Sequence, residues 1–350
     1  MRSSRQIHVV GCHAEGEVGD VIVGGVLPPA GDSVFAMMRA FERDQDHIRR
    51  FLICEPRGSV ARHVNLIVPA KRADCVAGAI IMEPTEYPPM SGSNTMCVAT
   101  VLLETGMVAM QEPETRFRLD MPGGPVDVAA RCKGGKALSI TLGNVPCFAE
   151  RLGAMLDVEG VGAIAVDVAY GGMFYALIDA AALGFSIRPD EARDLAVLGE
   201  KIRVAARAQF EVRHPENPDI RGVSIVQFHA PFEGAGTAAR NTCIVSPGRS
   251  DRSPTGTGLS ARLAALHARG LLKVGDAFSH LSIIGSRFEG RIASETTCGG
   301  RPAIVPEITG RAYLTGAMTY WLDPDDPFPD GYVVADTWGV STATSQDQTP

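Results

Sequence analysis

The chain of 350 residues is 45% hydrophobic and 21% charged, a composition typical of a globular protein long enough for two domains. Its net charge of −7 and aromatic content of only 6% argue against nucleic acid and against an anionic membrane as partners. The eight cysteines are scattered without a CxxC pair, which argues against a disulfide framework and against a zinc site.

The first residues give no sign of a targeting segment. Residues 1–6 are followed by a short strand-like run over residues 7–11, and not by an apolar signal region. No stretch of about 18 apolar residues, the length that spans a membrane, occurs in the sequence. We therefore expect a cytoplasmic protein.

In the first half of the chain, apolar runs of strand length alternate with one helical region. We expect a helix over residues 33–44, which residues 48–52 either continue or follow as a second short helix. Strands are expected where short apolar runs are bounded by Gly, Pro or charged residues. These runs lie at residues 7–11, 20–24, 64–68, 77–82, 117–121, 126–130 and 138–142.

The second half of the chain has a similar alternation. Residues 195–209 have the spacing of apolar residues that favours a helix. The polar tail over residues 342–350 is expected to be frayed. Strands are expected over residues 163–169, 172–179, 222–230, 242–245, 278–284, 287–292, 303–307 and 312–319.

One short pattern occurs in both halves and places a hydroxyl residue where a helix is expected to begin. Residues 91–93 read Ser-Gly-Ser, and residues 255–257 read Thr-Gly-Thr. Each is followed by an apolar run that stops at a glycine, Gly106 or Gly270, fifteen positions after the hydroxyl residue. A hydroxyl start and a glycine stop predict a helix of about four turns in each copy.

Both halves share the order of strands, hydroxyl turn, central helix and further strands. This order predicts a mixed α/β (α+β) fold with two pseudo-equivalent domains. We expect the break near residues 143–156, which gives an N-terminal domain over residues 1–145 and a C-terminal domain over residues 146–311. The last segment, about 312–345, either completes the first domain or stays with the second.

The two helix starts are candidate binding sites for an anion. Unpaired N–H groups at a helix start attract a carboxylate, and Gly92 would let a ligand approach the backbone closely. If the two starts face each other, one small carboxylate-bearing molecule fits between them. The alternative is that Ser91 and Thr255 are ordinary N-caps, but such a cap needs no glycine directly after it, where glycine costs helix stability.

A carboxylate precedes the second hydroxyl residue. Asp251 lies four positions before Thr255 and could pair with an ammonium group while the helix starts hold a carboxylate. A zwitterionic amino or imino acid would match both. The alternatives are that Asp251 caps its own loop or forms a salt bridge with Arg249 or Arg252.

The same segments resemble the two active-site segments of the proline racemase family. The resemblance implies the fold of diaminopimelate epimerase, in which two pseudo-symmetric domains each wrap a β-sheet around a central helix and bind the ligand between the helix starts. It spans roughly residues 7–320. The residues that carry it are Ser-Gly-Ser-Asn-Thr at 91–95 and Asp-Arg-Ser-Pro-Thr-Gly-Thr-Gly at 251–258, with further agreement at 13–17, 24–25, 171–179 and 284–291.

The chain departs from part of this family at both catalytic positions. The family includes proline racemases, 4-hydroxyproline 2-epimerases and trans-3-hydroxy-L-proline dehydratases. Racemases and epimerases of this type have a cysteine on each face of Cα, and some epimerases have Ser at the first position but keep Cys at the second. Here the two positions are Ser91 and Thr255. A hydroxyl is a far weaker acid than a thiol, and Thr at the second position resembles the dehydratase branch.

The resemblance to the dehydratases implies a role for each residue. In trans-3-hydroxy-L-proline the Cα hydrogen and the leaving hydroxyl share one ring face, so one acid/base group can serve both. We expect Ser91 to be this catalytic group, Thr255 to face it across the ligand, and Asp251 to contact the amine. The substrate carboxylate is expected to meet backbone N–H groups of Gly92, Ser93, Gly256 and Thr257.

The group that activates Ser91 is not visible in the sequence. His13, Glu15, Glu83 and a bound water are candidates, although each side chain is more often structural than catalytic. The sequence contains no phosphate-binding loop, dinucleotide fingerprint or metal cluster. We therefore expect no cofactor and no metal.

The predicted function is a cofactor-independent hydro-lyase of hydroxyproline catabolism, with a small imino acid as its partner. It would convert trans-3-hydroxy-L-proline to Δ2-pyrroline-2-carboxylate, which tautomerises to the Δ1 form. One alternative is a 4-hydroxyproline 2-epimerase, which exchanges the Cα hydrogen without loss of water. Another is a non-catalytic imino-acid-binding protein, which proline-like ligands stabilise without turnover. The oligomeric state, a homodimer included, is left open.

Overall fold

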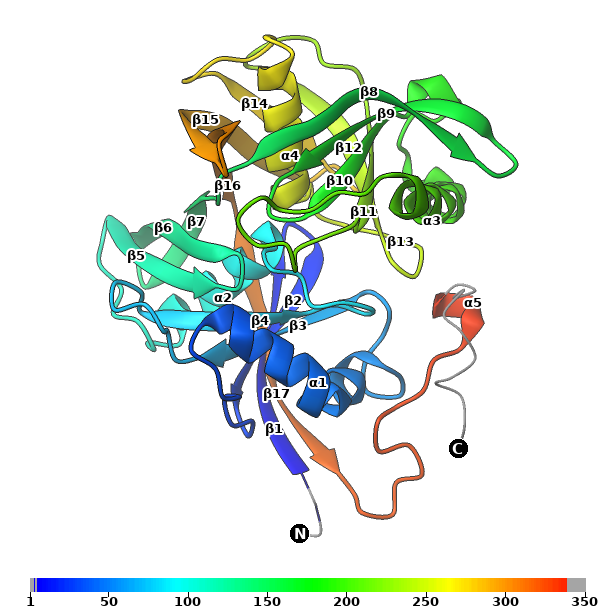
Figure 1. Cartoon of the computed structure of the whole chain (residues 1–350). Helices are drawn as coiled ribbons and strands as arrows, with labels where there is room; N and C mark the ends of the chain where they lie inside the picture. The colour runs from blue at the N-terminus through cyan, green and yellow to red at the C-terminus, as the bar shows by residue number, and fades with distance from the viewer. Residues whose placement is uncertain (1–2, 4, 339–350) are drawn as a thin grey trace.

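Two helices, one from each half of the chain, lie at the centre of the molecule and are enclosed by strands (Figure 1). The computed structural model describes residue 3 and residues 5–338. Helix α2 (Gly92–Glu104) is buried over its first twelve residues, and helix α4 (Gly256–Ala268) over its first eleven. Because both helices are apolar on nearly every side, they are stable only where other elements cover all of their faces.

In the N-terminal half, strands surround α2 and a second helix covers the outside. Helix α1 (Val34–Ile53) packs through a buried apolar side on strands β3 (Arg62–Val68) and β4 (Ala77–Met82). Its N-cap Ser33 accepts a hydrogen bond from the backbone N of Ala36 at 3.1 Å. The strands of this half are β1 (Arg5–Ala14), β2 (Glu17–Gly24), β3 (Arg62–Val68), β4 (Ala77–Met82), β5 (Glu114–Met121), β6 (Gly124–Lys133) and β7 (Lys136–Gly143).

The C-terminal half repeats this arrangement around α4. Helix α3 (Ala192–Gln209) lies outside, after the short helices η1 (Ala181–Leu183) and η2 (Pro189–Glu191). The strands are β8 (Phe148–Val158), β9 (Gly162–Tyr170), β10 (Phe174–Asp179), β11 (Ile225–His229), β12 (Ala238–Val245), β13 (Arg249–Ser250), β14 (Ala277–Leu281), β15 (Arg287–Cys298) and β16 (Arg301–Gly310).

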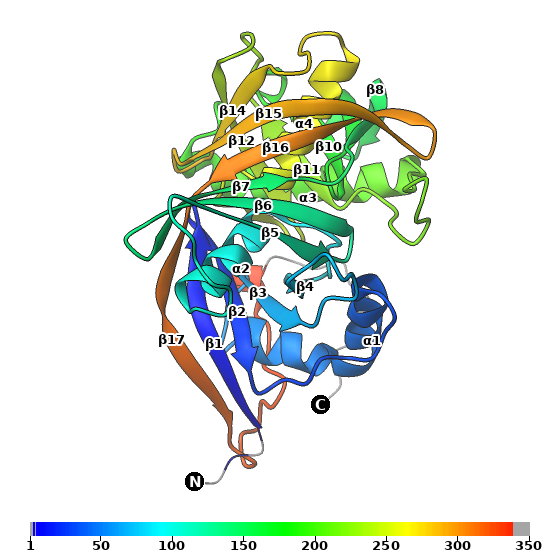
Figure 2. The same cartoon turned by 90° about the vertical axis from the view of Figure 1, so that its left-hand side faces the viewer.

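Backbone pairing joins the two halves into one hydrogen-bonded network. Strand β16 pairs antiparallel with β7 where the halves meet (Figure 2). The chain then returns to the N-terminal half, because β17 (Ala312–Leu322) pairs antiparallel with β1 along its whole length. A short helix, α5 (Ala335–Trp338), follows. One apolar cluster contains residues of both central helices, among them Met96, Val101, Leu259 and Leu263.

The structure confirms the predicted alternation of elements and the two central helices. Each central helix begins at the glycine after the hydroxyl residue, and the predicted stops Gly106 and Gly270 have φ of 76° and 72°. The two predicted helical stretches, residues 33–44 and 48–52, belong to one helix, α1 (Val34–Ile53), with a non-helical residue, Gln45, at the expected division. The tail over residues 342–350 lies outside the described residues.

The prediction missed strand β8, which covers most of the segment where we expected a break. Its register with β9 shifts twice, near Ala149 and near Arg151. Such bulges disrupt the alternation of buried and exposed residues that identifies a strand in a sequence. The short elements β13 and α5 were also not predicted.

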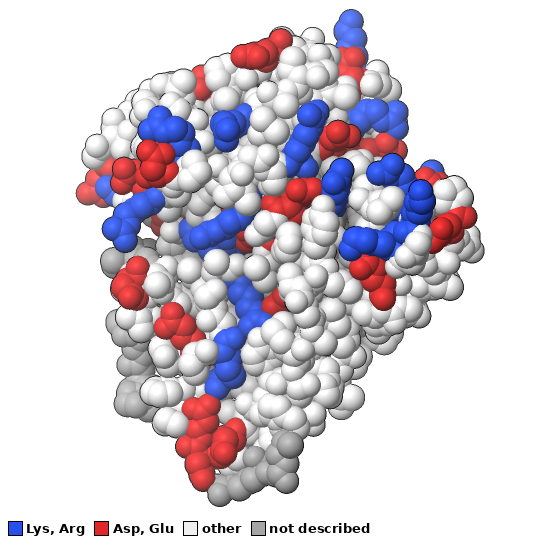
Figure 3. Space-filling view, turned by 180° about the vertical axis from the view of Figure 1, so that it is seen from behind, with Lys and Arg blue, Asp and Glu red and all other residues white. Residues whose placement is uncertain are grey.

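On the face of the molecule shown in Figure 3, basic and acidic side chains lie interspersed. Many of the exposed charges form ion pairs; Arg118, for example, contacts Asp74 at 2.6 Å and Asp127 at 2.7 Å. Solvent screens such exposed pairs, so they contribute little to stability. Within the described part of the chain, no helix has both the length and the apolar character needed to cross a membrane.

Candidate active site

The starts of the two central helices touch each other. A Cβ atom added at Gly92 would lie 2.8 Å from the Cα of Gly256, and one added at Gly256 would lie 2.9 Å from the Cα of Gly92. No side chain fits at either position. The structure adds a second reason for the glycine, beside the approach of a ligand, because the helix starts are in direct backbone contact.

Ser91 lies at the start of α2, with an extended backbone (φ −145°, ψ 122°) and 7% of its surface exposed. Its side chain makes no N-cap hydrogen bond. Instead, its Oγ accepts a hydrogen bond from Nδ2 of Asn94 at 2.9 Å. A donor aimed at this oxygen stabilises negative charge on it, and so does the partial positive charge at a helix start.

Thr255 lies at the start of α4 in a strained conformation. Its φ is 61° and its ψ is 106°, a combination that a β-branched residue rarely adopts and that costs about 1–3 kcal/mol. Its side chain makes no N-cap hydrogen bond either; its Oγ1 donates to Oδ2 of Asp251 at 3.2 Å. The interpretation of Ser91 and Thr255 as ordinary N-caps is therefore wrong.

The seven predicted site residues surround one small enclosed cavity. Its volume is about 10 Å³, which is room for about one water molecule, so a five-membered ring needs the surrounding elements to move apart. The lining comes from both halves of the chain. It comprises Glu83, Ser91, Gly92 and Ser93 from the first half, and Met173, Tyr175, Ile225, Val245, Asp251, Thr255, Gly256 and Thr257 from the second.

Asp251 is buried in this cavity with no ion pair in the described structure. Its Oδ1 accepts a hydrogen bond from the backbone N of Ser253 at 2.7 Å. Asp251 therefore caps its own loop, as one of the alternatives from the sequence predicts. Burial and the nearby charge of Glu17 raise its pKa to about 8, although Arg249 acts in the opposite direction. An ammonium group in the cavity would favour the ionised carboxylate.

A network of polar side chains lies behind Ser91. Nδ2 of Asn94 is 3.1 Å from Nδ1 of His63, and Nε2 of His63 contacts the guanidinium of Arg249. Arg249 also forms a buried ion pair with Glu17. Burial and the Arg249 charge lower the pKa of His63 to about 3. This neutral imidazole holds Asn94 in place but does not reach Ser91.

The ion pair between Glu17 and Arg249 fixes the loop that carries Asp251. Burial alone would raise the pKa of Glu17, but the Arg249 charge, the His63 ring and the hydrogen bonds from Arg249 and the Arg252 backbone together outweigh it and bring this pKa to about 2. The other carboxylate oxygen of Glu17 accepts a hydrogen bond from the backbone N of Arg252 at 2.7 Å. Glu17 thus connects the turn after β1 to the loop before α4. No local pattern in the sequence predicts these contacts, because they join segments far apart in the chain.

The predicted carboxylate-binding groups lie together at the helix starts. In the described chain, the backbone N–H groups of Gly92, Ser93, Gly256 and Thr257 have no protein acceptor, as expected for the first turn of a helix. The Thr257 hydroxyl is not free for a ligand, since it lies 2.6 Å from the Tyr175 hydroxyl. The arrangement leaves backbone donors of both helices for one anion.

Of the candidates to assist Ser91, only Glu83 lines the cavity. His13 stacks on Tyr313 and accepts a hydrogen bond from the backbone of Gly16, while Glu15 lies in the turn between β1 and β2. Glu83 follows strand β4 directly and is buried. Burial and the neighbouring charge of Glu86 raise its pKa well above the usual range.

No cysteine lines the described cavity. Cys243 is buried behind Thr255, its thiol 3.7 Å from Oε1 of Gln227, and burial raises its pKa well above the usual value. The thiol is therefore protonated and is a poor base. Among the described residues, no group of three or more His, Cys, Asp or Glu side chains is placed to hold a metal ion.

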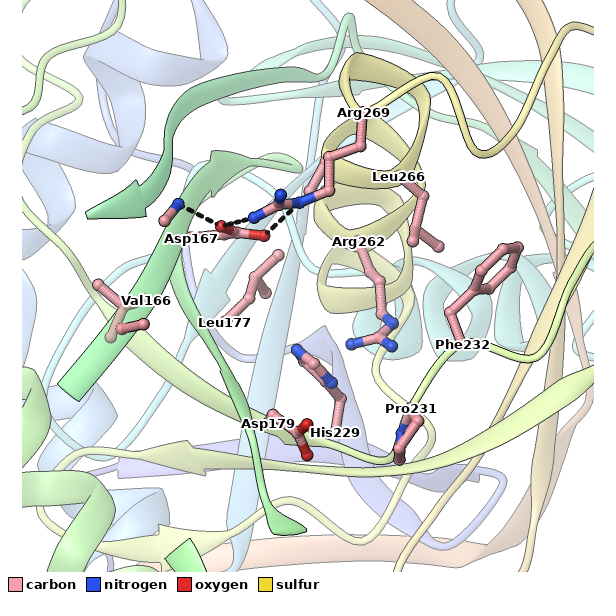
Figure 4. A pocket seen from close by; sticks show the side chains of 13 residues that line it. Val166, Asp167, Leu177, Asp179, His229, Pro231, Phe232, Arg262, Leu266 and Arg269 are labelled. Atoms are coloured by element: carbon pink, nitrogen blue, oxygen red, sulfur yellow. Dashed lines mark hydrogen bonds and ion pairs between the residues drawn. The ribbon is translucent and has the colours of Figure 1, made fainter. Parts of the chain in front are cut away.

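A larger cavity, of about 360 Å³, lies on the outer side of α4 and is built from the C-terminal half alone (Figure 4). Its labelled side chains include Arg262, whose guanidinium donates to the carbonyl of Ala230 at 2.8 Å. Asp167 and Arg269 form an ion pair at its wall, at 2.6 Å. None of the predicted site residues lines this cavity.

Two solved structures of bacterial proteins are similar to this chain over nearly its whole length. A hydroxyproline epimerase from Agrobacterium vitis, solved with bound trans-4-OH-L-proline, is 43% identical, with a TM-score of 0.92 over 97% of this chain and 99% of that chain. A probable proline racemase from Agrobacterium radiobacter K84, solved with bound carbonate, is 42% identical, with a TM-score of 0.91 over 95% and 98%.

More distant structures share the fold alone. A predicted epimerase from Pseudomonas aeruginosa is 16% identical, with a TM-score of 0.53 over 91% of this chain and 99% of that chain. This likeness confirms the predicted fold class, a mixed α/β fold of the epimerase type. A sequence profile described as proline racemase matches residues 9–333. The chain therefore belongs to the proline racemase family.

Proposed function

We propose that this protein is a trans-3-hydroxy-L-proline dehydratase, which removes water without a cofactor and forms Δ2-pyrroline-2-carboxylate. The observation that carries the proposal is the unequal state of the two facing hydroxyls. Ser91 Oγ accepts a hydrogen bond from Asn94, whereas Thr255 Oγ1 donates its hydrogen to Asp251. Only one of the two hydroxyl oxygens therefore accepts a hydrogen bond that stabilises negative charge on it.

One hydroxyl is sufficient for the proposed elimination. The Cα–H bond breaks, its proton goes to Ser91 Oγ, and its electron pair forms the C2=C3 double bond. The C3–O bond breaks at the same time, and the leaving oxygen takes the hydroxyl proton of Ser91 and departs as water. Ser91 ends as it began, since it gains one proton and gives one. The hydroxyl proton moves to the leaving oxygen ahead of the incoming Cα proton, so Oγ carries partial negative charge in the transition state, and the hydrogen bond from Asn94 stabilises that charge.

The other contacts would orient the ring for this step. The substrate carboxylate would lie at the helix starts, where the developing charge next to Cα is stabilised. The ammonium would pair with Asp251, which is buried and carries no other ion pair in the described structure. Thr255 would then close the opposite face of the ring without exchanging a proton.

The second candidate is a 4-hydroxyproline 2-epimerase, and the comparisons favour it. The similar structures include a hydroxyproline epimerase with bound trans-4-OH-L-proline and a probable proline racemase. An epimerase needs a proton donor on the second face of Cα. Thr255 and Asp251 together would have to supply it, since no cysteine lines the described cavity.

Proton NMR of the purified protein in D2O distinguishes the candidates. It would be run separately with trans-3-hydroxy-L-proline, trans-4-hydroxy-L-proline and L-proline. Loss of the 3-hydroxy compound with appearance of a pyrroline carboxylate is the expected result. Deuterium at Cα of the 4-hydroxy compound without loss of water would instead support the epimerase. Binding without turnover of any compound would support the third interpretation, an imino-acid-binding protein.

A further inference from the structure

We infer that the Glu83 side chain recognises the ring hydroxyl of the substrate. The inference rests on the proposed function only in taking a hydroxylated imino acid as the ligand. It holds whether that ligand is dehydrated or epimerised. Glu83 would thus be the residue that distinguishes hydroxyproline from proline.

The backbone holds Glu83 at the edge of the cavity. Glu83 follows the buried strand β4, and its backbone N donates to the carbonyl of Glu86 at 2.9 Å. Its own carbonyl accepts a hydrogen bond from Nη1 of Arg49 at 3.4 Å, and this guanidinium also contacts the carbonyl of Pro84. The side chain is 3% exposed and lines the same cavity as Ser91 and Asp251.

The Glu83 carboxyl lacks a partner of its own. Its Oε2 is buried and has no hydrogen bond in the described structure. Its Oε1 lies 3.7 Å from Nδ1 of His63, which is beyond hydrogen-bond distance, and that imidazole is neutral because its pKa is about 3. Buried polar groups in proteins are nearly always hydrogen-bonded. An unpartnered carboxyl at the wall of a ligand cavity therefore points to a contact with the ligand.

Charge balance indicates which group of the ligand Glu83 contacts. A zwitterionic imino acid has one ammonium group, while the described cavity has two acids, Glu83 and Asp251. If both were ionised, one buried negative charge would remain unpaired. Glu17 and Glu86 face Glu83 as further negative groups, and Arg249 is already paired with Glu17. Asp251 is therefore the partner of the ammonium, and Glu83 stays neutral, with an O–H to donate.

The position of Glu83 fits a ring hydroxyl on the Ser91 side of the ligand. Glu83 and Ser91 both come from the N-terminal half, whereas Asp251 and Thr255 come from the C-terminal half. In trans-3-hydroxy-L-proline the hydroxyl shares a ring face with the Cα hydrogen. A ring placed with its Cα hydrogen toward Ser91 thus directs its hydroxyl to the side from which Glu83 approaches.

Binding measurements on two variants test the inference. Glu83→Gln keeps a neutral side chain of the same shape with an N–H donor, while Glu83→Leu removes every polar atom. Both are made in the Ser91→Ala background, with NMR confirming that no turnover occurs. Isothermal titration calorimetry then compares trans-3-hydroxy-L-proline with L-proline. We expect the background to favour the hydroxylated ligand by at least about tenfold, because proline would leave Glu83 unpaired.

The two variants are expected to differ. Glu83→Gln should keep this preference within about threefold, and Glu83→Leu should abolish it, at least about a tenfold change in the ratio of the two affinities. Equal weakening of both ligands in Glu83→Gln would overturn the inference, since it would assign Glu83 to the ammonium. The inference would also be overturned if Glu83→Leu left the ratio of the two affinities unchanged, or if the Ser91→Ala background bound both ligands equally well.

A third ligand shows whether the variants are intact. Pyrrole-2-carboxylate has neither an ammonium nor a ring hydroxyl, so its affinity should stay within about threefold in both variants. The readout is an equilibrium affinity, so it does not depend on which reaction occurs. If the protein is a dehydratase but does not prefer the hydroxylated ligand, only the role of Glu83 is contradicted. If it is an epimerase and does prefer the hydroxylated ligand, only the proposed reaction is contradicted.

Discussion

The starts of α2 and α4 have the same layout but hold their hydroxyls in opposite ways. Each helix begins at a glycine, each glycine touches the other, and each is preceded by a buried hydroxyl residue. Ser91 has an ordinary extended backbone, and its oxygen receives a hydrogen bond. Thr255 has a positive φ, and its hydroxyl donates a hydrogen bond to Asp251.

Two helix starts with the same pseudo-symmetric layout therefore need not carry out the same chemistry. A proton transfer across both faces of Cα needs two groups that can each take and return a proton. Here the oxygen at the first helix start accepts a hydrogen bond from Asn94, and the hydroxyl at the second donates one to Asp251. Substitutions at the two helix starts and at the groups around them test whether the chemistry follows this asymmetry.

Removal of the first hydroxyl should abolish turnover. In Ser91→Ala, the α-proton loses its acceptor and Asn94 loses its partner, so we expect kcat to fall by about 10³-fold or more. Binding of pyrrole-2-carboxylate should change little, which calorimetry can measure. Thr100→Val is a matched control, because it removes a buried hydroxyl of α2 that has no hydrogen bond in the described structure. Retained turnover in Ser91→Ala would exclude this serine as the base.

Separation of the helix starts should damage both stability and catalysis. In Gly92→Ala, the new Cβ meets the Cα of Gly256 at 2.8 Å, so the helices must shift. We expect the free energy of unfolding to fall by about 1–3 kcal/mol. A shift of the reacting groups of about 1 Å can lower kcat by up to about 10²-fold. Gly316→Ala is the control, since an added Cβ there meets no atom within 4 Å. Equal melting temperatures in the two variants would contradict the contact.

The ionisation of Asp251 should control binding of the ammonium. Its pKa of about 8 in the ligand-free protein means that the carboxyl is mostly protonated at lower pH. The affinity for substrate should therefore rise by about tenfold per pH unit up to about pH 8 and then level off. Asp251→Asn should remove this dependence and weaken binding at pH 8 by about 10- to 100-fold.

The same pKa predicts an opposite trend in stability. The folded state holds the Asp251 proton more tightly than the unfolded state, where the usual value is 3.8. The contribution of this group to the free energy of unfolding is therefore complete below about pH 4 and is lost as the pH rises through 8. Urea unfolding at several pH values measures this contribution as the difference between the free energies of unfolding of wild type and Asp251→Asn. A difference that is constant with pH would mean that Asp251 is ionised throughout.

Local signals were sufficient to predict the framework. The apolar runs, the hydroxyl starts and the stops at Gly106 and Gly270 depend only on neighbouring residues, so both central helices could be located from the sequence. Strand β8 was missed because its bulges break the local pattern. The predicted residues Ser91, Thr255 and Asp251 do line one cavity, because the motifs that carry them sit at the two helix starts.

The polar environment of these residues could not be predicted. Glu17 and Arg249 are 232 positions apart, and only the folded chain brings them together beside His63. The backbone conformation of Thr255 and the direction of its hydrogen bond are likewise set by the loop around it, not by its own residue type. The asymmetry between the two helix starts is therefore a tertiary property, which the near-identical local sequences conceal.

The smallest loss of activity is expected at the second hydroxyl. Thr255→Val keeps the shape and the β-branch but removes the hydrogen bond to Asp251. If the second face only closes the site, kcat for dehydration should fall by less than about tenfold, well below the 10²–10⁴-fold typical of a general acid or base. A loss as large as that of Ser91→Ala would show that both hydroxyls move protons, as an epimerase requires.

Replacement of Thr255 by cysteine tests whether a proton donor on the second face of Cα is what the protein lacks for epimerisation. Thr255→Cys would place on the second face a group that ionises far more readily than a hydroxyl. Burial and Asp251 already raise the pKa of the adjacent Cys243, so the new thiol should be protonated and able to donate to Cα. We expect the variant to gain exchange of the Cα hydrogen of trans-4-hydroxy-L-proline in D2O, with inversion at Cα. If wild type already shows this exchange at a comparable rate, the two helix starts are chemically equivalent, and the dehydratase proposal gives way to the epimerase.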